Sequence, residues 1–61
     1  MARFIIEKLE DGKYKHCLSV EGGEYMSPKI VWMSQKYWFL RGEFRVYKAD
    51  EFEKAECFSR E

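Results

Sequence analysis

The sequence predicts a small α+β domain, an antiparallel meander of four or five strands, curled as in SH3-like and OB-like folds, with one short C-terminal helix. Three observations lead to this prediction. An Asp-Gly pair at 11–12 separates two strand-like stretches, the stretch 29–48 is rich in aromatic and β-branched residues, and an acidic run after Asp50 has the composition of a helix start. At 61 residues the chain is expected to form one domain, residues 1–61.

The first two predicted strands, 3–9 and 14–20, form a hairpin around Asp11-Gly12. A type I′ turn needs positive φ at both central residues, and Asp-Gly is a favoured pair for it. With this tip, Glu7 lies opposite His16. The next predicted partners are Ile6 with Cys17, Ile5 with Leu18 and Phe4 with Ser19. The better core face of this hairpin collects Ile5, Leu9, Tyr14, Leu18 and Val20.

The central stretch allows two interpretations. Ser27 as N-cap, Pro28 at the first helical position and Gly42 beyond the end favour a helix. In such a helix the apolar residues would spread almost all the way round and leave large aromatic side chains in water. Two strands, about 29–34 and 36–41, are therefore favoured, and the helix stays as the alternative.

The tail is predicted to add one strand and one helix. Arg41-Gly42 would be a hairpin tip leading into a strand at 43–48. Asp50 then begins a capping box, which predicts a short helix at about 51–58. The helix residues expected on the sheet are Phe52, Ala55 and Phe58.

The strand interpretation sorts the central residues onto two faces. The face assigned to the core carries Ile30, Trp32, Tyr37, Phe39, Phe44 and Val46. On the other face Trp38 would lie opposite Arg45, and Lys36 opposite Tyr47, so cations and aromatic rings alternate across the strands. The candidate binding site on that face consists of Lys36, Trp38, Arg45, Tyr47, Met33 and Arg41. The plainer alternative is a solvated face held by cation–π and stem contacts.

Charge distribution bears on the partner. Net charge is zero, but residues 29–48 carry five basic and one acidic side chain, and residues 49–61 two basic and five acidic. Zero net charge with only five local cations favours a protein partner, because nucleic-acid binders usually carry a larger basic excess. The predicted function is a non-enzymatic protein-binding module, an inhibitor or regulator of a larger protein. The alternatives are single-stranded nucleic-acid binding on the same face, or a homodimer through that face or the edge near Pro28.

Catalysis, metals and cofactors are not expected. The only histidine, His16, is predicted to be structural, against Glu7. Neighbouring strand residues point to opposite faces, so Cys17 and His16 cannot act on one atom. Cys17 and Cys57 are expected to be reduced thiols, because two cysteines do not make a disulfide framework. No apolar run has the length of a signal peptide core or a membrane span, so the predicted location is cytoplasmic, with no membrane partner.

Overall fold

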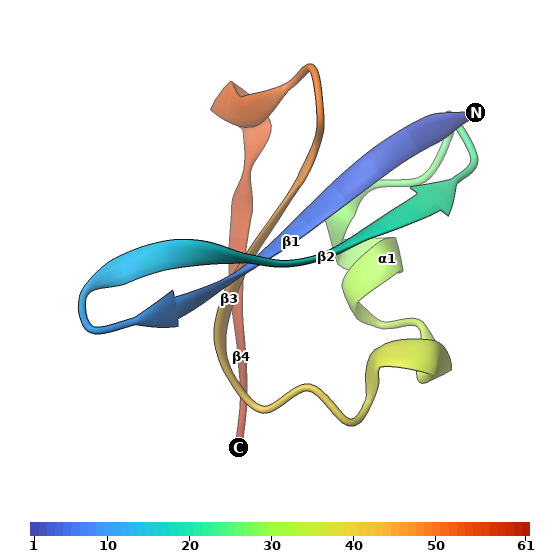
Figure 1. Ribbon diagram of the computed structural model, residues 1–61. Coiled ribbons are helices and arrows are strands. Elements are labelled where there is room, and N and C mark those ends of the chain that lie inside the picture. The colour runs from blue at the N-terminus through green and yellow to red at the C-terminus, as the bar shows by residue number, and fades with distance from the viewer.

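An open, twisted, antiparallel sheet of four strands dominates the computed structural model, which describes all 61 residues (Figure 1). The strands are β1 (Ala2–Glu10), β2 (Lys13–Gly22), β3 (Gly42–Lys48) and β4 (Glu56–Arg60). Their order in the sheet is β2-β1-β3-β4, and the sheet does not close into a barrel. The predicted α+β class and antiparallel sheet are therefore confirmed. The SH3-like or OB-like meander is not confirmed, because β3 pairs with β1 instead of β2.

The predicted hairpin forms around Asp11-Gly12, both with positive φ. Its register holds from the tip to the pair Glu7–His16 and then shifts, so that Ile6 faces Leu18 instead of the predicted Cys17. One extra residue in β2 is the mark of a β-bulge, which exchanges the two faces of the strand beyond it. The predicted core face was therefore right for Val20, which is buried, and for Leu18, which packs against the core. It was wrong for Ile5, Leu9 and Tyr14, and Phe4 and Ile6 of β1 are buried instead.

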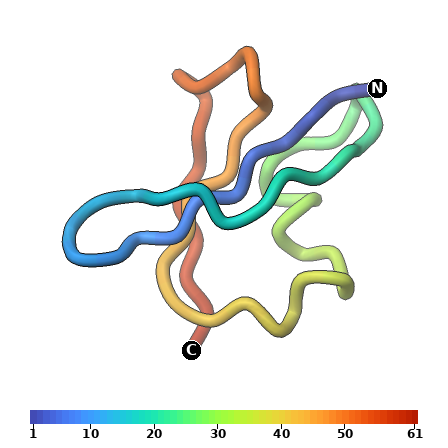
Figure 2. Tube along the Cα trace, viewed as in Figure 1, coloured from blue at the N-terminus to red at the C-terminus, as the bar shows by residue number.

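One face of the sheet carries the core, and the segment after β2 covers it. Residues 25–41, here called the cover segment, run back across this face before entering β3 (Figure 2). The eight buried residues are Phe4, Ile6, Val20, Val31, Trp32, Leu40, Phe44 and Val46. Trp32 has its ring centroid 5.1 Å from that of Phe44 and stacks on Phe58 at 5.6 Å. Burial of these aromatic and aliphatic side chains between the two layers is the main source of stability.

The cover segment is helical, so the two strands predicted at 29–34 and 36–41 were wrong. It holds one turn and a half of α-helix, α1 (Pro28–Trp32), and a 3₁₀ turn, η1 (Gln35–Tyr37). The hydroxyl of Ser27 accepts a hydrogen bond from the amide of Ile30 at 3.3 Å, and that of Ser34 caps η1. The capping signals in the sequence thus prevail over β-propensity.

The tail also differs from its prediction. The predicted helix at 51–58 is replaced by a 3₁₀ turn, η2 (Phe52–Lys54), followed by β4. An isolated helix of eight residues is marginal in water, whereas β4 gains hydrogen bonds along the free edge of β3. The predicted hairpin at Arg41-Gly42 is absent too, since the chain enters β3 from η1, with Gly42 at φ +121°.

Candidate functional site

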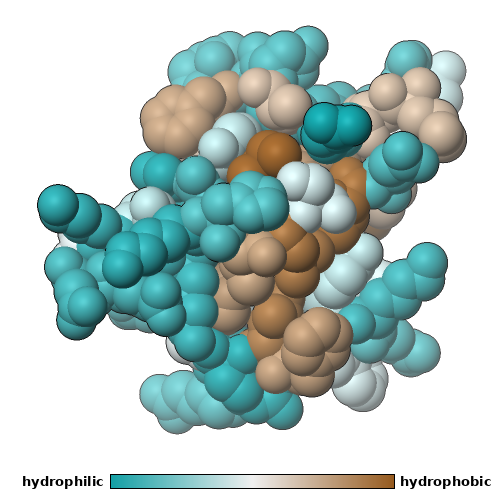
Figure 3. Space-filling view, viewed as in Figure 1, coloured by the Kyte–Doolittle hydropathy of each residue, from teal (hydrophilic) through white to brown (hydrophobic).

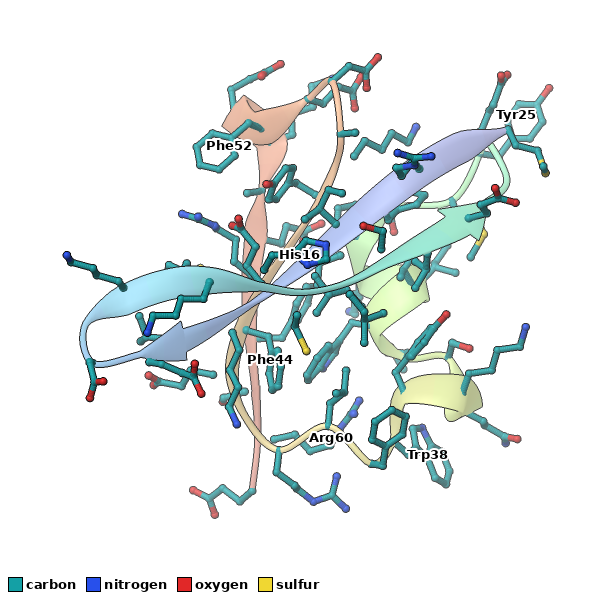
Figure 4. The ribbon with its side chains drawn as sticks, viewed as in Figure 1. His16, Tyr25, Trp38, Phe44, Phe52 and Arg60 are labelled. Carbon is teal, nitrogen blue, oxygen red and sulfur yellow. The ribbon has the colours of Figure 1, made fainter.

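The outer side of the cover segment exposes large apolar side chains. Val31, Trp32 and Leu40 point to the sheet and are buried. Between residues 30 and 39, four others are more than half exposed: Ile30 (53%), Met33 (62%), Trp38 (57%) and Phe39 (70%). In Figure 4, Trp38 lies at the far end of the cover segment and points away from the strands. Side chains of this size in water, close together in one short segment, are typical of a surface that meets another molecule.

The charged residues of the cover segment are all basic. It contains three basic residues, Lys29, Lys36 and Arg41, and no aspartate or glutamate. Lys29 and Lys36 form no ion pair within the chain. Arg41 folds back on its own segment and donates to the carbonyl oxygens of Trp38 and Leu40. The apolar surface therefore has two free ammonium groups beside it.

A hollow of about 110 Å³ lies where the cover segment meets β2. Its lining residues are Val20, Glu21, Met26, Val31, Ser34, Lys36 and Tyr37. Its lining combines apolar side chains with one side chain of each charge, Glu21 and Lys36. A hollow of this size accepts one side chain of a partner, which suits it as an anchor point in an interface. Elsewhere, the visible face in Figure 3 shows a central apolar band surrounded by hydrophilic side chains.

Arg45 and Tyr47 lie on the other side of the sheet, away from the cover segment. The side chain of Arg45 donates from Nε to Glu7 Oε1 at 2.8 Å, and both side chains are largely shielded from water. The rings of Tyr14 and Phe52 lie 4.2 and 4.7 Å from the guanidinium carbon of Arg45. Tyr47 meets Phe52 edge-on at 4.9 Å. The charge of Arg45 is thus neutralised and sandwiched inside the chain.

The predicted binding site therefore splits between two layers. Met33, Lys36, Trp38 and Arg41 lie in the cover segment, whereas Arg45 and Tyr47 lie on the uncovered face of the sheet. The predicted pairs of Trp38 with Arg45 and of Lys36 with Tyr47 are wrong, because both depended on strands that do not form. Sequence reasoning missed Ile30 and Phe39, which it assigned to the core. The helical alternative already implied that large apolar side chains of this segment face water, and it could have identified these two residues.

The ionisation of the Tyr47 phenol predicts how stability changes at high pH. Partial burial, and then the negative charge of Glu7, raise the pKa of Tyr47 above its ordinary value of about 10. The folded protein then holds the phenol proton more tightly than the unfolded chain does. This contribution to stability is present below pH 10 and is lost as the pH rises through the folded pKa. We expect the midpoint of urea denaturation to fall as the pH rises above 10, and to fall less steeply in Tyr47→Phe. Equal dependence of the midpoint on pH in the two proteins would contradict a raised pKa for Tyr47.

The pKa of Tyr14 is also raised above its ordinary value, but by a different cause. Its hydroxyl lies 3.5 Å from Cys57 Sγ, and this hydrogen bond is the largest cause that raises the pKa of Tyr14. The neighbouring Arg45 acts against it by favouring the phenolate. Cys57 and Cys17 are both exposed and form no disulfide with each other.

His16 and the acidic side chains do not combine into a metal-binding cluster. His16 does lie opposite Glu7 in the register, but its ring bonds Ser19 Oγ at 2.9 Å, while Glu7 binds Arg45. No three side chains of His, Cys, Asp or Glu lie close enough together to hold a metal ion. The structure contains no helix with the length and apolar character needed to span a membrane.

Together these features define a small α+β protein whose open antiparallel sheet has one covered face, with an apolar and basic surface on the cover. Comparison with protein-family models, curated proteins and solved structures finds no match to this chain.

Proposed function

We propose that this chain is a non-enzymatic protein-binding module, which acts as an inhibitor or regulator by occupying a site on a larger protein. The observation that carries this proposal is the exposure of Ile30, Met33, Trp38 and Phe39 on one short segment without acidic residues. The partner surface would be apolar at its centre and acidic at its rim, where it meets Lys29 and Lys36. Tryptophan and phenylalanine at the centre of an interface, with charges around them, are typical hot spots.

The fate of the five cations in residues 29–48 supports a protein partner over single-stranded nucleic acid. Arg45 is paired with Glu7, Arg41 donates to carbonyl groups of its own segment, and Lys48 donates to the carbonyl of Glu24 at 2.9 Å. Only Lys29 and Lys36 remain free for phosphates. Two phosphate contacts give weak binding with a shallow salt dependence. The cytoplasmic location stays a prediction from the sequence.

The test is capture of the partner with a tagged chain from cells that naturally make it, followed by affinity measurement with the purified partner. We expect Trp38→Ala to weaken binding by about thirtyfold, the effect of losing a hot spot of about 2 kcal/mol. Tyr25→Ala is the matched control, because Tyr25 is a fully exposed aromatic side chain of the same segment. Equal affinities of Trp38→Ala and wild type would contradict the proposal.

A fluorescence titration with short single-stranded oligonucleotides tests the second candidate function. Tryptophan quenching that weakens with salt and disappears in Trp38→Ala would replace the protein partner with nucleic acid. A flat titration is expected.

A further inference from the structure

The sheet has two free edges, β2 and β4, and only β2 carries lysines and a bulge. β2 carries Lys13 and Lys15 and is bent by the bulge at Cys17. Lysines and bulges are features by which natural sheets avoid pairing at their edges. β4 contains no lysine, no proline and no bulge in its pairing with β3. Its outer row of backbone N–H and C=O groups is therefore available to a strand from another molecule.

We propose that two copies of this chain pair through β4, antiparallel and related by a two-fold axis at Phe58. The two four-stranded sheets would then join into one sheet of eight strands. Phe58 would lie opposite Phe58 of the partner subunit, and both would remain stacked on their own Trp32. A two-fold axis makes this interface closed, so the product is a dimer and not a fibre.

The charges of β4 are self-complementary in this register. Glu56 would lie opposite Arg60 of the partner subunit, and Arg60 opposite Glu56 of the partner subunit. A shift of the register in one direction would bring Lys54 opposite the partner's Arg60, which is repulsive. A shift in the other direction would bring Phe58 opposite the partner's Arg60 and lose both ion pairs. Opposite charges across strands stabilise a pairing and like charges weaken it, so the register centred on Phe58 is favoured.

Of the two groups needed for these pairs, the Glu56 carboxylate is free in the single chain and the Arg60 guanidinium is free only at Nε. Glu56 is exposed and takes part in no ion pair or side-chain hydrogen bond of the chain. Arg60 uses Nη1 and Nη2 to bind carbonyl groups of the cover segment, and its Nε–H has no partner. With only five residues in β4, the pairing is short, so the dimer is expected at sub-millimolar concentration and not at nanomolar concentration.

Cysteine crosslinking tests the register directly, in a Cys17→Ser background. The proposal places Cys57 opposite Ser59 of the partner subunit, on the uncovered face. Ser59→Cys should therefore give an intermolecular disulfide under mild oxidation, by bonding the new thiol to Cys57 of the other chain. The matched control is the same variant with Cys57→Ser, in which each remaining thiol faces a serine and little crosslinking is expected. Equal crosslinking in the control, or none in Ser59→Cys, would overturn the register.

Sedimentation equilibrium tests the dimer itself. The wild type is expected to sediment at sub-millimolar concentration with more than the 7.4 kDa mass of one chain. Glu56→Lys should weaken self-association by about tenfold, because it turns both ion pairs into repulsions. Glu53→Lys makes the same charge change outside β4 and should leave it unchanged. A wild type that stays monomeric, or equal effects of the two variants, would overturn the proposal, whereas the partner-binding role of the cover segment would be unaffected.

Discussion

Replacing Trp32 with alanine is expected to lower the free energy of unfolding by about 3–5 kcal/mol, the range for removing a buried aromatic side chain. Trp32 is 6% exposed and lies between the rings of Phe44 and Phe58, with the guanidinium of Arg60 4.1 Å from its own ring. A domain of this size has roughly 3–9 kcal/mol of stability in total. Trp32→Ala should therefore be largely unfolded or close to it, as measured by urea denaturation followed by circular dichroism.

The second tryptophan provides the control. Trp38 is 57% exposed, so Trp38→Ala should change the free energy of unfolding by no more than about 0.5 kcal/mol, as surface substitutions usually do. If Trp32→Ala does not fold at all, Trp32→Phe gives a smaller loss that can be measured. Equal denaturation midpoints for Trp32→Ala and Trp38→Ala would show that the cover segment does not pack on the sheet as described.

The two tryptophans also show what the sequence could predict. Trp32, Phe44 and Val46 were predicted to share the core, and all three are buried. That prediction succeeded for Trp32 although its segment is a helix and not a strand. It failed for Ile30, which was assigned to the same face but is exposed, because residues two apart point to nearly opposite sides of a helix. The hairpin was predicted from Asp11-Gly12 alone, since few dipeptides suit two successive positive φ values.

The errors have two physical causes. The bulge in β2 depends on which face of β1 meets β3 and the cover segment, and no local signal near Cys17 encodes it. A helix was only the second choice for the cover segment because it would leave large aromatics in water, and the structure does leave Trp38 and Phe39 there. Local rules fail most often where a protein has a functional surface, so this failure is itself consistent with the binding role proposed for the segment.

The candidate site was predicted only in part for the same reason. Its residue types, an exposed tryptophan with nearby cations, could be identified from composition. Its geometry could not, because the pairing of Trp38 with Arg45 required a sheet register that never forms. Arg45 instead finds Glu7, which lies 38 positions away in the sequence. Contacts of that separation depend on strand order, which the sequence alone did not reveal.

Replacing Arg60 with methionine is expected to lower the free energy of unfolding by about 2–3 kcal/mol and to loosen the cover segment. Arg60 Nη2 donates to the carbonyl of Trp32 at 3.0 Å, and Nη1 donates to the carbonyls of Tyr37 and Leu40. One β4 side chain thus binds the last residue of α1, the last residue of η1 and Leu40 beyond it. Hydrogen bonds from a charged donor contribute about 1.5–3 kcal/mol, and the cation over Trp32 adds about 0.5–1 kcal/mol. Methionine keeps the stem and removes the donors.

Hydrogen exchange separates this role from general destabilisation. The amides of Tyr37 and Leu40, which bond within the cover segment, should exchange faster in Arg60→Met at low micromolar concentration, while amides shared by β1 and β2 exchange at rates set by global unfolding. Arg3→Met is the control, because Arg3 is exposed on the same sheet and its side chain forms no hydrogen bond or ion pair. If both variants unfold at the same urea concentration, the carbonyls bound by Arg60 do not hold the cover segment. If only Arg60→Met unfolds at a lower urea concentration, then β4 fixes the position of the surface that is proposed to bind the partner.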